Sequence, residues 1–187
     1  RPGVQALERA ARAGIPAHTV DYAASSDRAT FDAVLAETIA ACRPAIVVLA
    51  GVMRILAPAT VDAWAGRMLN VHPSLLPRYP GLHTYRRALA AGDSHHGSTV
   101  HFVIPELDAG PGILQYRVPI RPGETEASLR GRVQAGEYLV YPRAIAWLAA
   151  GRCELKDGAA WLDGARLDGP VVVDEGASAT SPLRWAS

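Results

Sequence analysis

LNVHPSLLPRYPGLHTYRRAL, residues 69–89, joins a short apolar strand to a polar loop that contains three prolines. The strand is predicted over residues 67–71, so Asn70 and His72 fall at its carboxyl end, two residues apart. Because side chains alternate along a strand, both point to the same face. Ligands of open α/β sheets bind at the carboxyl ends of strands. The stretch therefore predicts a sheet edge that presents an amide and an imidazole to a common ligand.

The segments before and after this stretch alternate between helix and strand patterns. Apolar residues spaced three and four apart predict helices, and continuous apolar runs predict buried strands. One helix is capped by Ser26 or Asp27 and ends before Pro44. The other predicted helices cover residues 4–13, 58–65 and 85–91, and the strands cover residues 16–20, 45–50, 67–71 and 99–104. This alternation is typical of an α/β fold.

Beyond residue 108 the pattern changes. A strand over 113–120 is expected to be antiparallel, and a long helix is expected from about residue 126 to 149. Pro142 should kink or divide that helix, because proline lacks the backbone N–H of the helical ladder. Short strands are predicted over 153–155 and within 160–167, with Asp163-Gly164 as a tight turn. From about residue 168 to 187 we expect a flexible tail.

Composition sets limits on partners. The 187 residues, 49% of them hydrophobic, fit one domain spanning 1–187. The net charge is +1, and the basic residues are scattered along the chain, which argues against an extended nucleic-acid surface. No apolar run approaches the length that spans a membrane. Cys42 and Cys153 lack the spacing of a paired site, which favours a reducing cytoplasm, and the adjacent His95-His96 pair does not predict a metal site.

A third polar residue extends the candidate site. Asp108 lies in ELDAGP, residues 106–111, another polar turn that follows an apolar strand. An amide, an imidazole and a carboxylate together suit acyl-group transfer. Each residue alone also has a structural explanation, since Asn70 and Asp108 are common in turns and His72 suits a partly exposed surface.

The stretch 69–89 resembles the signature of the glycinamide ribonucleotide formyltransferase family. The resemblance continues through VVLAGVMRIL (47–56), HGSTVHFVIPELDAGPGILQ (96–115), RVQAGEYLVYP (132–142) and WLDGARL (161–167), in the order the family has them. It implies a Rossmann-like formyltransferase fold with a mostly parallel sheet, flanking helices and an antiparallel C-terminal part. It also implies transfer of a formyl group from 10-formyltetrahydrofolate to the amino group of 5'-phosphoribosylglycinamide in de novo purine biosynthesis.

The resemblance assigns roles to residues of this chain. Asn70 would stabilise the oxyanion, His72 would carry protons, and Asp108 would orient His72 and favour its charged form. His101 would support the site from behind, unless it is only structural. The residues implied for the folate are Arg28, Val52, Met53, Arg54, Ile55, Leu56, Asn70, Ile104, Pro105, Glu106, Leu107 and Asp108. Those implied for the nucleotide substrate are Pro73, His83, Gln134, Ala135, Gly136 and Glu137.

The chain departs from the family pattern at its start. Arg1 falls after the first strand, the glycine-rich phosphate loop and the first helix of the family, so we expect an N-terminally incomplete domain. Other formyl-folate enzymes remain alternatives: a formyltetrahydrofolate hydrolase, or a methionyl-tRNA formyltransferase, for which too few residues follow Ala150. A non-catalytic folate-binding fragment is a further alternative. Monomer and homodimer are both compatible with the sequence.

Overall fold

The computed structural model describes residues 4–52 and 54–177, and the chain divides into two compact units, Arg1–Ala45 and Ile46–Ser187. The first unit holds α1 (Gln5–Arg12), the short helix η1 (Tyr22–Ala24) and α2 (Arg28–Ala41). Asp27 caps α2 as predicted, because its carboxylate accepts the N–H of Thr30 at 2.8 Å. The strand expected over 16–20 is wrong. A strand needs a neighbour for its backbone groups, and the described residues of this unit form helices without any strand.

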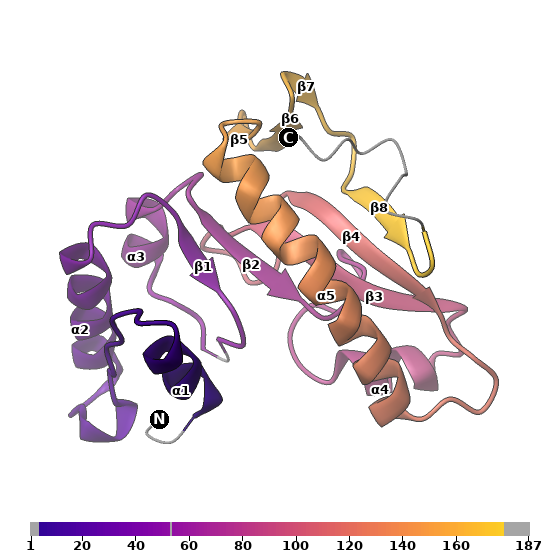
Figure 1. The fold of residues 1–187 in the computed structure, drawn as a ribbon, viewed down its shortest axis with the longest axis horizontal. Coiled ribbons are helices and arrows are strands. Elements are labelled where there is room, and N and C mark those ends of the chain that lie inside the picture. Colours follow the sequence, from indigo (N-terminus) through magenta and orange to yellow (C-terminus); the bar gives the residue numbers. More distant parts are fainter. Residues whose placement is uncertain (1–3, 53, 178–187) are drawn as a thin grey trace. The chain divides into compact units, whose positions relative to one another are not determined.

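The second unit is built on a five-stranded sheet with the order β1-β2-β3-β4-β8 (Figure 1). Its strands are β1 (Val47–Leu49), β2 (Met68–His72), β3 (His95–Phe102), β4 (Gly112–Pro119) and β8 (Val171–Asp174). The pairs β1–β2 and β4–β8 are parallel, whereas β2–β3 and β3–β4 are antiparallel. The predicted α/β fold and the antiparallel pairing of the strand expected over 113–120, which is β4, are therefore confirmed.

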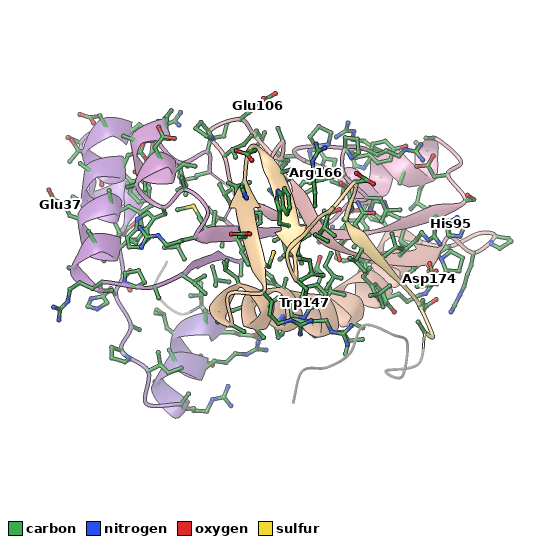
Figure 2. All side chains as sticks on the ribbon, turned by 90° about the horizontal axis from the view of Figure 1, so that it is seen from above. Glu37, His95, Glu106, Trp147, Arg166 and Asp174 are labelled. Carbon is green, nitrogen blue, oxygen red and sulfur yellow. The ribbon has the colours of Figure 1, made fainter. Side chains whose placement is uncertain are left out.

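Helices and a small second sheet complete this unit. Helix α5 (Glu126–Ala149) lies across one face of the five-stranded sheet, and α4 (Thr84–Ala90) packs near its N-terminal end (Figure 1). The core between α5 and the sheet is made of fully or nearly buried side chains, among them Leu69, Val100, Phe102, Leu129, Val133 and Trp147. Figure 2 labels Trp147 on α5. The remaining elements are α3 (Pro58–Ala63), β5 (Cys153–Lys156), β6 (Ala159–Leu162) and β7 (Ala165–Arg166).

The predicted Asp163-Gly164 turn joins β6 to β7. Both residues have left-handed backbones, with φ of 51° and 78°. A two-residue hairpin loop with positive φ at both positions matches the right-handed twist of the strands. The Asp-Gly pair suits this turn because glycine adopts positive φ without strain and aspartate tolerates it better than most residues.

Two expectations for the C-terminal part are corrected. Helix α5 runs undivided through Pro142. Proline lacks the N–H that would bond the carbonyl of Tyr138, and Tyr138 itself lies on the exposed side of the helix, at 63% exposure. Of the tail expected over 168–187, residues 171–174 instead form β8, whose three valines pair in parallel with β4, and residues 178–187 lie outside the described residues. Among the described residues, none of the helices is long and apolar enough to cross a bilayer.

Candidate active site

The β2–β3 pairing builds the first part of the site. Asn70 and His72 lie on one face of β2, and the register places Asn70 opposite His101 and His72 opposite Thr99. The amide nitrogen of Asn70 therefore lies 3.2 Å from Nε2 of His101. Directly opposed residues on one face of an antiparallel pair are close enough to interact. The two strands thus gather an amide and two imidazoles near the carboxyl end of β2.

Asp108 reaches this cluster from the turn that follows β3. Its backbone is left-handed, with φ of 52°, a conformation that aspartate adopts more readily than most residues. Gly110 allows the chain to return tightly, because a Cβ there would lie 1.8 Å from the carbonyl oxygen of Phe102. The buried carboxylate of Asp108 accepts the N–H of Gly81 at 2.9 Å, and the same oxygen lies 3.3 Å from Nδ1 of His72.

His101 fixes the orientation of the Asn70 amide. Its Nδ1 lies 2.8 Å from the carbonyl oxygen of Phe102, which only accepts hydrogen bonds, so Nδ1 carries the hydrogen. Burial lowers the pKa of His101 and favours the neutral ring. The lone pair on Nε2 then accepts from the Asn70 NH2 group. The second hydrogen of that group can be offered to a ligand in the pocket that Asn70 lines.

His72 is placed between two acceptors. Its Nε2 lies 2.9 Å from the carbonyl oxygen of Tyr79, and its Nδ1 faces the carboxylate of Asp108. A neutral ring has one N–H and satisfies only one of these neighbours, whereas an imidazolium satisfies both. The ring is 6% exposed. His72 would therefore donate to both neighbours only with a hydrogen on each ring nitrogen.

The loop after His72 is held to the sheet by side chains behind it. The hydroxyl of Thr99 donates to the carbonyl of Ser74 at 2.7 Å and accepts the N–H of Leu76 at 3.0 Å. Gln115 donates to the carbonyl of Leu76 at 2.9 Å. These bonds satisfy backbone groups of an irregular segment, so they fix its position relative to β3 and β4.

A pocket of about 500 Å³, including its open mouth, lies beside this cluster. The predicted folate residues that line it are Arg54, Ile55, Leu56, Asn70, Ile104, Pro105, Glu106, Leu107 and Asp108. Glu106 is exposed and points outward from its loop (Figure 2). Val52, which was also predicted, lines it as well. The lining residues outside the predicted set are Leu49, Val61, His101 and Val103. Leu49 could have been found from the sequence, because it ends the strand beside Asn70 and parallel strands bind ligands at that end.

Other predicted binding residues have different positions. Met53 lies outside the described residues. Arg28 begins α2 in the first unit, where its guanidinium lies 3.4 Å from Asp32. His83 precedes α4 with a left-handed backbone and is exposed, whereas Pro73 directly follows β2. Neither His83 nor Pro73 is one of the described residues that line the pocket.

The segment predicted to bind the nucleotide substrate forms one turn of α5. Gln134 and Ala135 are exposed and Gly136 is buried. Gly136 has a packing role, because a Cβ there would lie 1.9 Å from the ring of Tyr116. Glu137 is mostly buried, and this burial raises its pKa from 4.5 to about 7. The carboxyl group of Glu137 therefore changes charge near neutral pH.

Replacing Glu137 with glutamine is expected to stabilise the fold above neutral pH. A carboxyl whose pKa is raised on folding binds its proton more tightly in the folded state, so the protein loses stability as pH rises from 4.5 towards 7. Glutamine cannot ionise and avoids this loss. Denaturant unfolding should show a gain of roughly 1 to 3 kcal/mol near pH 8 that disappears near pH 4.5. The matched control is E154Q, a change at an exposed glutamate of β5. A stability difference that does not depend on pH would contradict this expectation.

No group of three or more histidine, cysteine, aspartate or glutamate side chains is placed to hold a metal ion, in the part of the chain that the structure describes. Cys153 is a buried member of the core, and burial raises the pKa of its thiol to about 12. Cys42 is exposed. Both cysteines are free thiols.

Known proteins resemble this chain in both sequence and fold. Residues 1–145 match the formyl transferase family. The phosphoribosylglycinamide formyltransferase of Escherichia coli K12 is 53% identical over 161 residues, which are 86% of this chain and 76% of that protein, and the enzyme of Haemophilus influenzae is 43% identical over the same length. The solved phosphoribosylglycinamide formyltransferase of Coxiella burnetii superposes with a TM-score of 0.85 at 43% identity, covering 91% of this chain and 82% of that chain. The chain therefore belongs to the formyl transferase family.

Proposed function

We propose that this chain transfers a formyl group from 10-formyltetrahydrofolate to the amino group of 5'-phosphoribosylglycinamide in de novo purine biosynthesis. One observation carries the proposal: Asn70 and Asp108 line the same pocket, with His72 3.3 Å from the Asp108 carboxylate. An oxyanion donor, a proton carrier and its carboxylate are the groups that acyl transfer to an amine needs. The names of the E. coli and H. influenzae relatives support the choice of substrate.

The walls of the pocket suit a flat, largely apolar ligand such as a folate. Val52, Ile55 and Leu107 line the pocket and are 44%, 51% and 49% exposed. Apolar side chains that gather at a pocket and remain open to water are typical of a ligand site, because the ligand covers them on binding. The polar groups of Asn70 and Asp108 would then fix the orientation of the folate at one part of this wall.

Asn70 acts on the developing charge. When the amine nitrogen attacks the formyl carbon, a new C–N bond forms and the carbonyl oxygen gains negative charge. The amide of Asn70, already held by His101, donates its second hydrogen to that oxygen. A donor that is fixed before the reaction costs no reorganisation when the charge appears.

His72 and Asp108 manage the protons. As the bond between the formyl carbon and the folate nitrogen breaks, the incoming amine must lose one proton and the folate nitrogen must gain one. His72 carries a proton that it can give up and recover, and the nearby carboxylate of Asp108 stabilises the charged ring. One imidazole can therefore serve both proton transfers.

The second substrate is assigned to Pro73, His83 and the segment from Gln134 to Glu137. When ionised, Glu137 can accept hydrogen bonds from the ribose hydroxyls. Because the pKa of Glu137 is raised to about 7, the nucleotide should bind more tightly as the pH rises through neutrality. The stability that E137Q gains would then be accompanied by weaker binding of this substrate.

The assay that tests the proposal mixes the full chain with 10-formyltetrahydrofolate and phosphoribosylglycinamide, follows folate absorbance and identifies products by mass spectrometry. We expect formylated phosphoribosylglycinamide in equal amount to the deformylated folate. A reaction without the amine substrate should leave the folate unchanged. Formate released at the same rate without that substrate would instead indicate a hydrolase, and folate binding without turnover would indicate a non-catalytic protein.

The enzyme is proposed to act in the cytoplasm on small molecules, as a monomer or homodimer, without a nucleic acid, a membrane or a metal ion as partner. The scattered charge of the sequence supports the first exclusion. Light scattering at several concentrations would distinguish a monomer from a homodimer.

A further inference from the structure

Tyr79 has an unusual backbone next to His72. It lies in the loop between β2 and α4, and its φ of 55° falls in the left-handed region that non-glycine residues rarely adopt. In this conformation its carbonyl oxygen lies 2.9 Å from Nε2 of His72. Rare backbone conformations persist only where surrounding contacts enforce them, and they often occur at functional sites. The contacts that hold Tyr79 in this conformation therefore also hold its carbonyl beside His72.

The side chain of Tyr79 is held from outside the site. Its hydroxyl donates to the carboxylate of Asp93 at 2.8 Å, and this bond raises the pKa of Tyr79. Asp93 lies in the turn between α4 and β3, is only 9% exposed, and also binds Arg78 at 2.6 Å. Arg87 of α4 lies over the Tyr79 ring at 5.0 Å and donates to the carbonyl of Pro80 at 2.7 Å. A buried carboxylate and a helix thus hold both ends of this short segment.

We propose that the hydrogen bond between Tyr79 and Asp93 positions the catalytic imidazole: it holds the Tyr79 carbonyl on Nε2 of His72 and so keeps Nδ1 facing Asp108. The inference rests on the proposed role of His72 in proton transfer. Tyr79 and Asp93 are positioning residues, because they act through His72. Neither of them is among the residues that line the pocket in the described part of the chain.

The physical reason lies in the two nitrogens of the ring. The carbonyl of Tyr79 accepts only from an N–H, so it fixes a hydrogen on Nε2 and prevents the ring from turning that nitrogen elsewhere. The titratable side chains that face or electrostatically affect His72 are Asp108, His96 and His101. If the carbonyl moves away, Nε2 loses its acceptor and Nδ1 no longer has a fixed position relative to Asp108.

The first variant is Y79F, which removes the hydroxyl and keeps the ring under Arg87. We expect kcat to fall by about tenfold while KM for both substrates changes by less than about twofold, because the proton carrier is misplaced but the pocket is intact. D93A breaks the same bond and also frees Arg78, so its loss should be at least as large, and the double variant should be no worse than D93A because the bond between Tyr79 and Asp93 is already lost. D93N keeps an acceptor for the hydroxyl and should retain more activity than D93A.

Y116F is the matched control, because Tyr116 lies in β4 and packs against Gly136 of α5, away from the loop. Its kcat should stay within about twofold of the parent. An equal loss in Y116F would assign the effect to general destabilisation and would overturn the inference. So would a kcat of Y79F and D93A close to that of the parent.

A measurement without activity separates this inference from the proposed function. Nitrogen NMR of the ring of His72 reports the hydrogen bonding of each ring nitrogen. Y79F and D93A should both shift the Nε2 signal, because the Tyr79 carbonyl no longer holds that N–H, whereas Y116F should leave the signal unchanged. If these shifts occur in a protein that transfers no formyl group, the positioning role stands and the proposed function fails. Unchanged signals in a folded Y79F protein would overturn the positioning role.

Discussion

Replacing Asn70 with alanine is expected to lower kcat for formyl transfer by about two to three orders of magnitude, the usual cost of removing one fixed oxyanion donor. The amide contacts the reacting oxygen only when charge develops there, so KM should change much less. The variant should still fold. The loss of the Asn70 amide leaves Nε2 of His101 without its partner, at a cost of about 1 to 3 kcal/mol in unfolding free energy.

N70D provides the control for shape. Aspartate has nearly the same volume but offers no N–H to the oxyanion, so it should lose as much activity as alanine. Steady-state kinetics with both substrates, together with thermal unfolding of each variant, separates catalysis from stability. Activity of N70A within tenfold of the parent would remove Asn70 from the mechanism.

Replacing Asp108 with asparagine is expected to lower kcat by about two to four orders of magnitude, the range in which positioned acid–base groups contribute. Asparagine tolerates the left-handed backbone at this position and can still accept the N–H of Gly81, so the turn should be preserved. The negative charge 3.3 Å from Nδ1 of His72 is lost. A positive charge that forms on the His72 ring during proton transfer then has no counter-charge beside it, so the transfer should slow.

D157N is the matched control for this substitution. Asp157 also has a left-handed backbone, with φ of 52°, and lies in the exposed turn between β5 and β6. The same chemical change there should leave kcat within about twofold of the parent. If D108N retained most of its activity, or if D157N lost as much, the carboxylate of Asp108 would have no special role in proton transfer.

The sequence predicted the parts of the fold and site that depend on local pattern. Asn70 and His72 fall on one face of β2 because strand side chains alternate, and the helix over 126–149 follows from its apolar spacing. Pro142 was expected to divide or kink this helix because of its local effect, whereas α5 continues through it, with Tyr138 one turn earlier on the exposed side. The three valines of β8 favour a strand, but they lie in a short run between Gly169-Pro170 and Asp174-Glu175, and no strand was predicted there.

The family resemblance supplied what spacing could not. Asp108 lies 36 residues after His72 in the sequence, and nothing in that separation predicts the 3.3 Å between them. The resemblance also implied that residues 104–108 bind the folate, and these residues do line the pocket. It gave less guidance on His101, whose alternatives of site support and plain structure remained open.

Local sequence therefore determined most of the strands and helices, the helix cap at Asp27 and the shared face of Asn70 and His72, because these depend on neighbours within a few residues. Only the tertiary structure decided that His101 orients the Asn70 amide, since that contact depends on the register between β2 and β3. The same holds for the raised pKa of Glu137, because burial is a property of the packed molecule and of no single segment.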